Sequence, residues 1–267
     1  MPLVRDTLAR EKTQRRARRQ ALKTLGLALF AGGGAWLARD PLRDVWQDWQ
    51  ADHHTARGER RSLMLADASR IDLDTGTAID VRFDGAQRLV RLLRGRILVS
   101  TASDPAATAG GAFRPFVVQT AQGRVRALGT RYSVRQYAQR SRVAVFEGAV
   151  EIRPDLDAQA PQLLRAGEQA WFTREAMEDV QRAAPGEAAW SAGMLAVQNM
   201  PLAMFIEELA RYTPGRLQCA PDAGRLKVSG IYPLDDVERV LDMLQRTLPV
   251  DVDRLTRYWL TVRLRAA

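Results

Sequence analysis

A strand pattern between residues 114 and 152 constrains the fold more than any other stretch of this chain. Val, Ile, Phe and Tyr dominate three apolar runs there, and in residues 124–127 arginine alternates with valine or alanine. A period of two is typical of a β-strand that buries one face. The runs are separated by pairs that end in Gly123 and Gly148, and glycine readily takes the positive φ of a tight reversal. We therefore expect neighbouring strands of one sheet.

The same pattern extends over residues 62–174. Short apolar runs rich in β-branched residues alternate with polar turns, among them a turn at Gly95 and a hairpin turn at Gly167. Short strands at regular spacing, separated by glycine-containing turns, are typical of an all-β domain. The sequence therefore predicts a coiled sheet, a sandwich or a jelly-roll-like arrangement over residues 62–174.

No group of residues in the sequence predicts catalysis, a metal site or a bound cofactor. Asp72, Asp74 and Asp80 alternate with apolar residues, so the strand period places all three on the outer, solvated face of the sheet. The only histidines are the adjacent pair His53-His54, whose side chains diverge, and Cys219 is the single cysteine. A lone cysteine excludes an internal disulfide and a cysteine-based zinc cluster. We therefore expect a protein that is not an enzyme.

The positive charge is concentrated at the N-terminus. The formal net charge is +9, and residues 1–23 hold eight basic and two acidic residues, which accounts for +6 of it. An uncharged segment follows at residues 24–38. A basic cluster on the N-terminal side of an apolar segment is the positive-inside arrangement of membrane proteins. The apolar residues that would anchor the segment are Leu25, Leu27, Leu29, Phe30, Trp36 and Leu37.

Residues 24–38 are short for a membrane helix, because fifteen residues span only about 22 Å as an α-helix. The candidates are a marginal transmembrane helix, the core of a signal peptide, or a buried helix of a soluble protein. We favour a retained anchor, with the basic tail in the cytoplasm and no direct role in nucleic-acid binding. Arg18-Arg19 followed by Leu22-Lys23 also resembles a twin-arginine export signal, although a positive flank explains the same residues. A polar linker is expected at residues 39–61.

After a second linker at residues 175–188, the rhythm changes to a mixture of strands and helices over residues 189–267. Leu202, Phe205, Ile206 and Leu209 fall on one face of a helix that begins at Pro201. The expected order is strand, helix, strand, followed by strand, helix, strand, strand. Each half begins with Pro-Leu and an amphipathic helix, so this region predicts a small α/β module with a βαβ repeat whose two halves share one core.

The β region contains, in this order, Arg114, Pro115, Phe116, Gly129, Thr130, Glu147 and Gly148. This order of residues resembles that of the FecR family. The C-terminal region is similar to the secretin and TonB short domain, with matching positions Trp190, Gly193, Leu202, Leu209, Arg211, Tyr212, Ser229 and Gly230. A turn motif with Leu65, Asp67 and Ser69 also matches, but Ala68 stands where the family has glycine. That turn must either avoid positive φ or accept strain.

The resemblance implies a function in signalling. FecR-family proteins are inner-membrane, single-pass, anti-sigma-factor-like regulators of extracytoplasmic-function sigma factors. Their periplasmic part receives a signal from the signalling domain of a TonB-dependent outer-membrane transporter, whose ligand is typically an iron chelate. The resemblance therefore implies two protein partners and a membrane for this chain, and it assigns the receiving role to the β region and the C-terminal module.

The sequence departs from the family before the membrane segment. Family members usually carry a helical sigma-binding domain of roughly 80 residues there, whereas about twenty mostly basic and polar residues stand in this sequence. We expect either that the start lies too far downstream or that the domain has been lost. The alternative function is a periplasmic, membrane-anchored interaction or structural module that works without a sigma factor.

Overall fold

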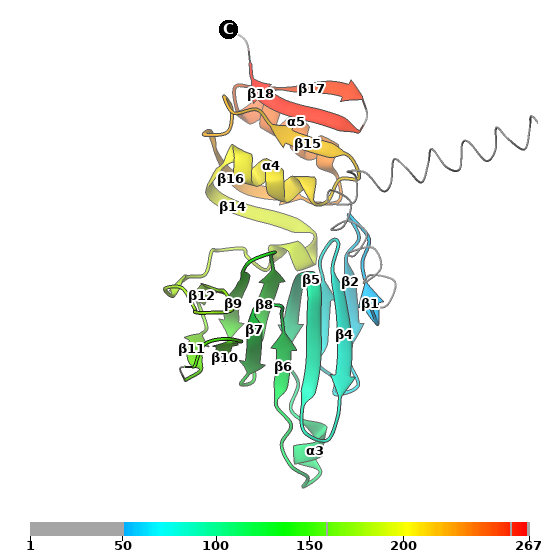
Figure 1. Cartoon of the computed structure of the whole chain (residues 1–267). Helices are drawn as coiled ribbons and strands as arrows, with labels where there is room; N and C mark the ends of the chain where they lie inside the picture. The colour runs from blue at the N-terminus through cyan, green and yellow to red at the C-terminus, as the bar shows by residue number, and fades with distance from the viewer. Residues whose placement is uncertain (1–50, 159, 257, 266–267) are drawn as a thin grey trace, which may run out of the picture. The chain divides into compact units, whose positions relative to one another are not determined.

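The computed structural model describes residues 51–158, 160–256 and 258–265 (Figure 1). The predicted basic tail and membrane segment lie outside these residues. None of the described helices is long and apolar enough to cross a membrane. The described chain divides into a β domain and a C-terminal α/β module, and each has a hydrophobic core.

The β domain is built almost entirely of strands. They are β1 (His53–His54), β2 (Arg61–Met64), β3 (Arg70–Leu73), β4 (Ala78–Phe83), β5 (Arg88–Ser100), β6 (Phe116–Gln119), β7 (Gly123–Ala127), β8 (Arg131–Gln136), β9 (Ser141–Glu147), β10 (Ala149–Pro154), β11 (Gln162–Arg165), β12 (Glu168–Phe172) and β13 (Gln181–Arg182), with one short helix, α3 (Pro105–Thr108). The prediction of an all-β domain is confirmed. Its sheet extends beyond the predicted limits, because β1 lies in the expected first linker and β13 in the second.

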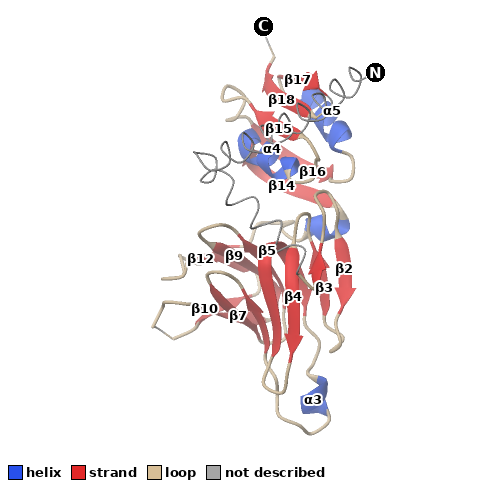
Figure 2. Cartoon of the chain, turned by 45° about the vertical axis from the view of Figure 1, so that its right-hand side comes forward, coloured by secondary structure: helices blue, strands red, loops and turns tan. Residues whose placement is uncertain are grey.

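The sheet folds over on itself around the long strand β5. The first part of β5 pairs with β4 and β6, and the second part pairs with β3 and β8. We name the strands β1, β4, β5, β6, β7, β10 and β11 half-sheet A, and the strands β2, β3, β5, β8, β9, β12 and β13 half-sheet B. Inward side chains from both halves, such as Val125 of β7 and Val143 of β9, form one core. Figure 2 shows the strands of the β domain in red.

Gly95 is the residue that allows β5 to pair with strands of both half-sheets. The sequence predicted a turn here, but β5 continues through Gly95, which has a φ of 90° and follows a bulge at Leu93 of β5, where Ala78 pairs with Arg94 and Ile79 with Leu92. An added Cβ would overlap Thr77. The prediction of a reversal was wrong because positive φ at this glycine accommodates a bulge inside a strand that is paired on both sides.

The structure also differs from the prediction at two other glycines. Gly167 has a φ of 84°, but β11 pairs with β10 and β12 pairs with β9, so the chain crosses between the half-sheets instead of forming a hairpin. The predicted reversal before Gly123 is present, because β6 and β7 pair as a hairpin, but Gly123 has no positive φ and begins β7. An added Cβ there would overlap the carbonyl oxygen of Arg153, so the close approach of β10 requires glycine at position 123.

The α/β module has the predicted order of elements. These are the 3-10 turn η1 (Ala189–Ala192), β14 (Met194–Pro201), α4 (Leu202–Ala210), β15 (Arg216–Cys219), β16 (Lys227–Pro233), α5 (Val237–Thr247), β17 (Val250–Thr256) and β18 (Trp259–Leu264). The helix α4 buries Leu202, Phe205, Ile206 and Leu209, as the spacing predicted, and Pro201 occupies its N-cap.

The strand pairing in the module differs from a βαβ repeat. β14 pairs with β16, whereas β15 pairs in parallel with β18, which also pairs with β17. Each half therefore contributes its first strand to one sheet and its last to another, so neither half forms a βαβ crossover within one sheet. Helices α4 and α5 both bury their apolar faces in the same core. Neither half of the module could form this core alone.

Candidate functional site

The residues predicted to bind a partner do not form one surface. Trp190, Leu202, Leu209 and Tyr212 are buried within the chain. Gly193 is buried as well and has a φ of 82°, and its carbonyl accepts a hydrogen bond from Leu234. Only Ser229 and Gly230, on β16, are exposed. Burial in the chain prevents the first group from contacting a partner directly in this conformation.

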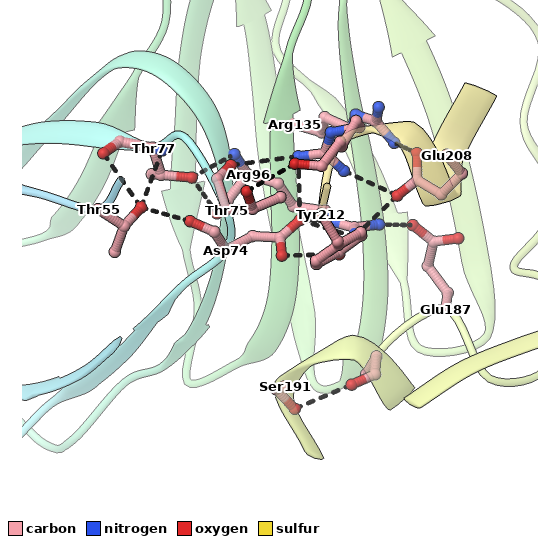
Figure 3. Close-up of polar contacts among 12 residues, drawn as sticks. Thr55, Asp74, Thr75, Thr77, Arg96, Arg135, Glu187, Ser191, Glu208 and Tyr212 are labelled. Atoms are coloured by element: carbon pink, nitrogen blue, oxygen red, sulfur yellow. Dashed lines mark hydrogen bonds and ion pairs between the residues drawn. The ribbon is translucent and has the colours of Figure 1, made fainter. Parts of the chain in front are cut away.

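Several of the buried residues meet the β domain in a network of charged side chains, which we name the interface network (Figure 3). Its members are Asp74, Arg96, Arg135, Arg142, Glu187, Glu208, Arg211 and Tyr212. Asp74 follows β3, and the first three arginines lie on β5, β8 and β9 of half-sheet B. Glu208 is in α4, while Arg211 and Tyr212 follow directly after it. The network therefore joins the α/β module to the β domain.

Asp74 is central to this network, although its position in the sequence predicted a solvated side chain. Its residue is 0% exposed. Arg96 contacts its Oδ2 atom at 2.7 Å, and Arg211 contacts the same atom at 3.0 Å. The hydroxyl of Tyr212 donates to Oδ1 at 2.8 Å. The prediction was wrong because β3 ends at Leu73, so the alternation of its faces does not extend to Asp74.

Arg96 links both parts of the chain. Its Nη2 atom donates to Tyr212 Oη at 2.9 Å and to Glu208 Oε1 at 3.0 Å. Its guanidinium also lies 4.9 Å from the centre of the Trp190 ring, a cation–π contact. Burial would lower the pKa of Arg96, but Asp74 and Glu208 raise it well above the usual range. The side chain is therefore charged at every pH at which the protein is folded.

The carboxylate of Glu208 forms ion pairs with three arginines. Besides Arg96, Arg211 contacts Oε1 at 2.7 Å and Arg135 contacts Oε2 at 2.7 Å. Burial would raise the pKa of this carboxyl, but the three guanidinium groups lower it far below the ordinary value. Each buried charge in the network thus has an opposite charge within hydrogen-bonding distance, as buried ions require. Arg142 and Glu187 form a further ion pair at the margin.

Backbone contacts reinforce the same junction. Thr75 Oγ1 donates to the carbonyl oxygen of Arg211 at 2.9 Å, and Arg57 Nη2 donates to that of Ala210 at 2.9 Å. A guanidinium of Arg60 also pairs with Asp235, at the start of the turn before α5. These contacts come from chain segments before and after β2. The junction is therefore held at several points.

Most of the family-motif residues of the β domain stabilise its fold through hydrogen bonds, core packing or close backbone contacts. Arg114 Nη2 donates to Asp104 Oδ1 at 2.8 Å, and its hydrogen bonds hold the pKa of Asp104 well below the usual range. Phe116, next to Pro115, is buried in the core, whereas Glu147 is exposed. Thr130 Oγ1 donates to the carbonyl oxygen of Ala149 at 2.6 Å. Beside it, Gly148 has a φ of 72°, and an added Cβ would overlap the carbonyl oxygen of Gly129.

The exposed part of the module offers a different kind of surface. Strand β17 lies at one edge of its sheet and ends in a hairpin with β18. At this hairpin Leu255 is 73% exposed and Trp259 is 41% exposed, with Arg216 stacked 4.9 Å from the Trp259 ring. An unpaired edge beside exposed apolar side chains is a site to which a partner strand can add. No group of His, Cys, Asp and Glu suited to a metal ion occurs among the described residues.

Only part of the interface network could be predicted from the sequence. Glu208, Arg211 and Tyr212 stand three and four residues apart, which places them on one side of a helix and its continuation. Asp74, Arg96, Arg135 and Glu187 carried no such signal, because they come from separate strands and loops that only the fold brings together.

Comparison with known proteins finds a family model that matches residues of the β domain. Residues 51–151 match the family model described as FecR protein. Two crystal structures of a proposed anti-sigma factor from Parabacteroides distasonis, at 2.50 and 1.65 Å resolution, have similar folds. Both give a TM-score of 0.64 at 20% sequence identity, and they cover 80% of this chain and 98% and 99% of their own. No curated protein matches the chain significantly.

Proposed function

We propose that the chain is a FecR-family protein and a signal-transducing regulator of a sigma factor, because residues 51–151 match the family model described as FecR protein. The observation that carries the proposal is this family match. The proposed anti-sigma factor from Parabacteroides distasonis supports it, since its fold is similar over four fifths of this chain, a larger share than the family model matches. A partner of the extracytoplasmic-function sigma class is part of the proposal.

We further propose that the protein spans the inner membrane once, through residues 24–38, with its N-terminus in the cytoplasm. The support is the sequence pattern, in which a basic tail precedes an uncharged segment. The β domain and the module would then lie in the periplasm. In that location the described residues would receive a signal and the basic N-terminal side would pass it on.

The proposed source of the signal is the signalling domain of a TonB-dependent outer-membrane transporter that imports an iron chelate. The exposed edge strand β17 and the hairpin that carries Leu255 and Trp259 support a receiving surface on the module. An added strand would gain affinity from backbone hydrogen bonds and specificity from alternate side chains. The interface network would then transmit a conformational change from the module to the β domain, since its ion pairs join α4 to half-sheet B.

A reporter gene under control of a sigma factor that binds the full chain tests the proposal. Deletion of residues 189–267 from the full chain should abolish the response to the transporter's ligand, while the protein stays in the membrane fraction. A double substitution, Leu255→Ala with Trp259→Ala, should weaken binding of the purified transporter signalling domain. Ile231→Ala is the matched control, because Ile231 is 62% exposed but lies on β16 in the other sheet.

Two results would contradict the proposal in different ways. If the full chain, also with an upstream extension, binds no sigma factor, the regulator role fails and the chain is a membrane-anchored interaction module. If a sigma factor binds but the transporter domain does not, only the proposed source of the signal is wrong.

A further inference from the structure

Exposed arginines gather on the outer face of half-sheet A, opposite the face that covers the core. The strand register places them in neighbouring rows. One row runs from Arg91 through Gln119 and Arg124 to Arg153, on β5, β6, β7 and β10. In the next row, Arg126 lies between Val117 and Glu151. With Arg82 of β4, this surface, which we name the arginine face, has five exposed arginines.

The arginine face holds a large share of the excess positive charge of residues 51–267. The carboxylates among these rows are Asp80 and Glu151, and Asp52 lies beside Asp80, so five arginines and three carboxylates give the face a net charge of +2. Residues 1–50 hold ten basic and five acidic residues, which leaves +4 of the total +9 for all of residues 51–267. Half of the excess charge of residues 51–267 therefore lies on one side of one half-sheet.

Two of these arginines are direct neighbours without a carboxylate between them. Arg124 of β7 and Arg153 of β10 are register partners, and like charges directly opposite each other destabilise a sheet. Arg126 has Glu151 at 3.3 Å, whereas no described carboxylate pairs with Arg124 or Arg153. All four side chains, with Val117 and Pro161, surround a shallow hollow of about 200 Å³. Guanidinium groups in such a cluster match the geometry of phosphate oxygens.

We propose that the arginine face docks on anionic phospholipid headgroups at the membrane surface. The chain favours a lipid surface over other anions because of where it enters the β domain. The predicted membrane segment ends at Ala38, and β1, an edge strand of half-sheet A itself, begins at His53. Even a fully extended chain covers at most about 3.6 Å per residue, so these fifteen steps reach about 54 Å at most.

This tether keeps half-sheet A close to the bilayer, and each arginine near an anionic surface adds to the attraction. Docking would fix the β domain on the bilayer and leave the module, on the other side of the interface network, free to meet a partner. The inference rests on the membrane location in the proposed function, but it requires neither a sigma factor nor a transporter.

Binding to lipid vesicles tests the proposal without the membrane segment. A fragment of residues 51–267 suffices, because both cores close within the described part of it. It should sediment with vesicles that contain phosphatidylglycerol and stay in solution with vesicles of phosphatidylcholine alone, and added salt should weaken the binding. The triple variant R124Q/R126Q/R153Q should bind the anionic vesicles at least about tenfold more weakly.

The matched control is R225Q/R239Q/R246Q, which removes the same charge from exposed positions of the module. It should bind like the unchanged fragment, and circular dichroism should show that both variants are folded. An equal loss in the control would mean that net charge alone drives binding, which overturns the assignment to this face. No binding to anionic vesicles, or equal binding to neutral ones, would also overturn it, whatever the outcome of the sigma-factor experiments.

Discussion

Replacing Glu208 with glutamine tests whether the interface network holds the module on the β domain. The substitution keeps the size of the side chain but removes the charge that Arg96, Arg135 and Arg211 share. Of the two carboxylate oxygens, one becomes an amide group that can only donate, and it would face an arginine that also donates. Three guanidinium groups would then surround one neutral side chain.

The expected cost follows from the burial of these charges. Removing one partner of a buried ion pair costs roughly 3–5 kcal/mol, because the other charge remains without compensation. Two features place Glu208→Gln at the low end. The Glu208 side chain is 13% exposed, and Asp74 still pairs with Arg96 and Arg211. We expect the free energy of unfolding to fall by about 3 kcal/mol, which lowers the urea midpoint by about 1 M.

The pH dependence gives a second, independent signature. The three arginines hold the pKa of folded Glu208 far below that of an unfolded glutamate, despite the opposing effect of burial. A lowered folded pKa contributes stability that is complete above the unfolded value, about 4.3, and is lost as the pH falls towards the folded value. The difference in stability between the wild type and Glu208→Gln should therefore be constant near neutral pH and should shrink below about pH 4.3.

Urea unfolding of residues 51–267, followed by circular dichroism at several pH values, measures both effects. Glu207→Gln is the control, because Glu207 makes the same chemical change on the exposed side of α4. Equal stability of the two variants at pH 7 would refute the role assigned to the network. A difference that stays constant down to pH 3 would show that charge pairing is not its cause.

Four further substitutions test single contacts by the same urea assay. Ala68→Gly should stabilise the fold by up to about 1 kcal/mol, because Ala68 has a φ of 65°, which glycine adopts without strain; an unchanged midpoint would contradict the strain. Gly148→Ala should cost about 2 kcal/mol or more, since its Cβ would overlap the backbone of Gly129, and full stability would disprove the close approach. Tyr132→Phe should be neutral or stabilising by about 1 kcal/mol, because the buried Tyr132 hydroxyl has no hydrogen-bond partner among the described residues. Tyr212→Phe should instead cost about 1–3 kcal/mol, because it removes the hydroxyl between Arg96 and Asp74; equal effects of the two tyrosine substitutions would count against the network.

The family resemblance could be recognised in the sequence because its motif residues occur in a fixed order along the chain, whichever contacts they make. Gly148 must be glycine because of its positive φ and the nearby strand, and Thr130 uses its hydroxyl to bond Ala149. The turn at Ala68 shows the limit of this reasoning. The sequence left two possibilities open, and the structure has the strained one, in which Asp67 and Ser69 hydrogen-bond across the turn.

Predictions failed where a residue's role depended on strands distant in sequence. Gly95 and Gly167 both looked like reversals, and the difference between a bulge and a crossover depends on which strands pair on either side. The alternation of faces along β3 predicts a solvated Asp74, but the strand ends at Leu73, so the alternation does not apply to Asp74. Trp190 and Tyr212 looked like surface contacts of a receiving module, yet both are buried at the junction with the β domain.

The sequence by itself determined the local periods: alternating strands over most of residues 62–174, the two amphipathic helices of the module, and the charge asymmetry around residues 24–38. These follow from side-chain polarity and backbone preference over a few neighbouring residues, so each can be seen in a short window. Only the tertiary structure decided that β5 is shared by two half-sheets, that the module exchanges strands between its halves, and that Asp74, Arg96 and Glu208 form one network. The physical reason is that strand pairing and the compensation of buried charge are long-range: a backbone group or an ion takes whichever partner the packed core brings to it, and no local pattern names that partner.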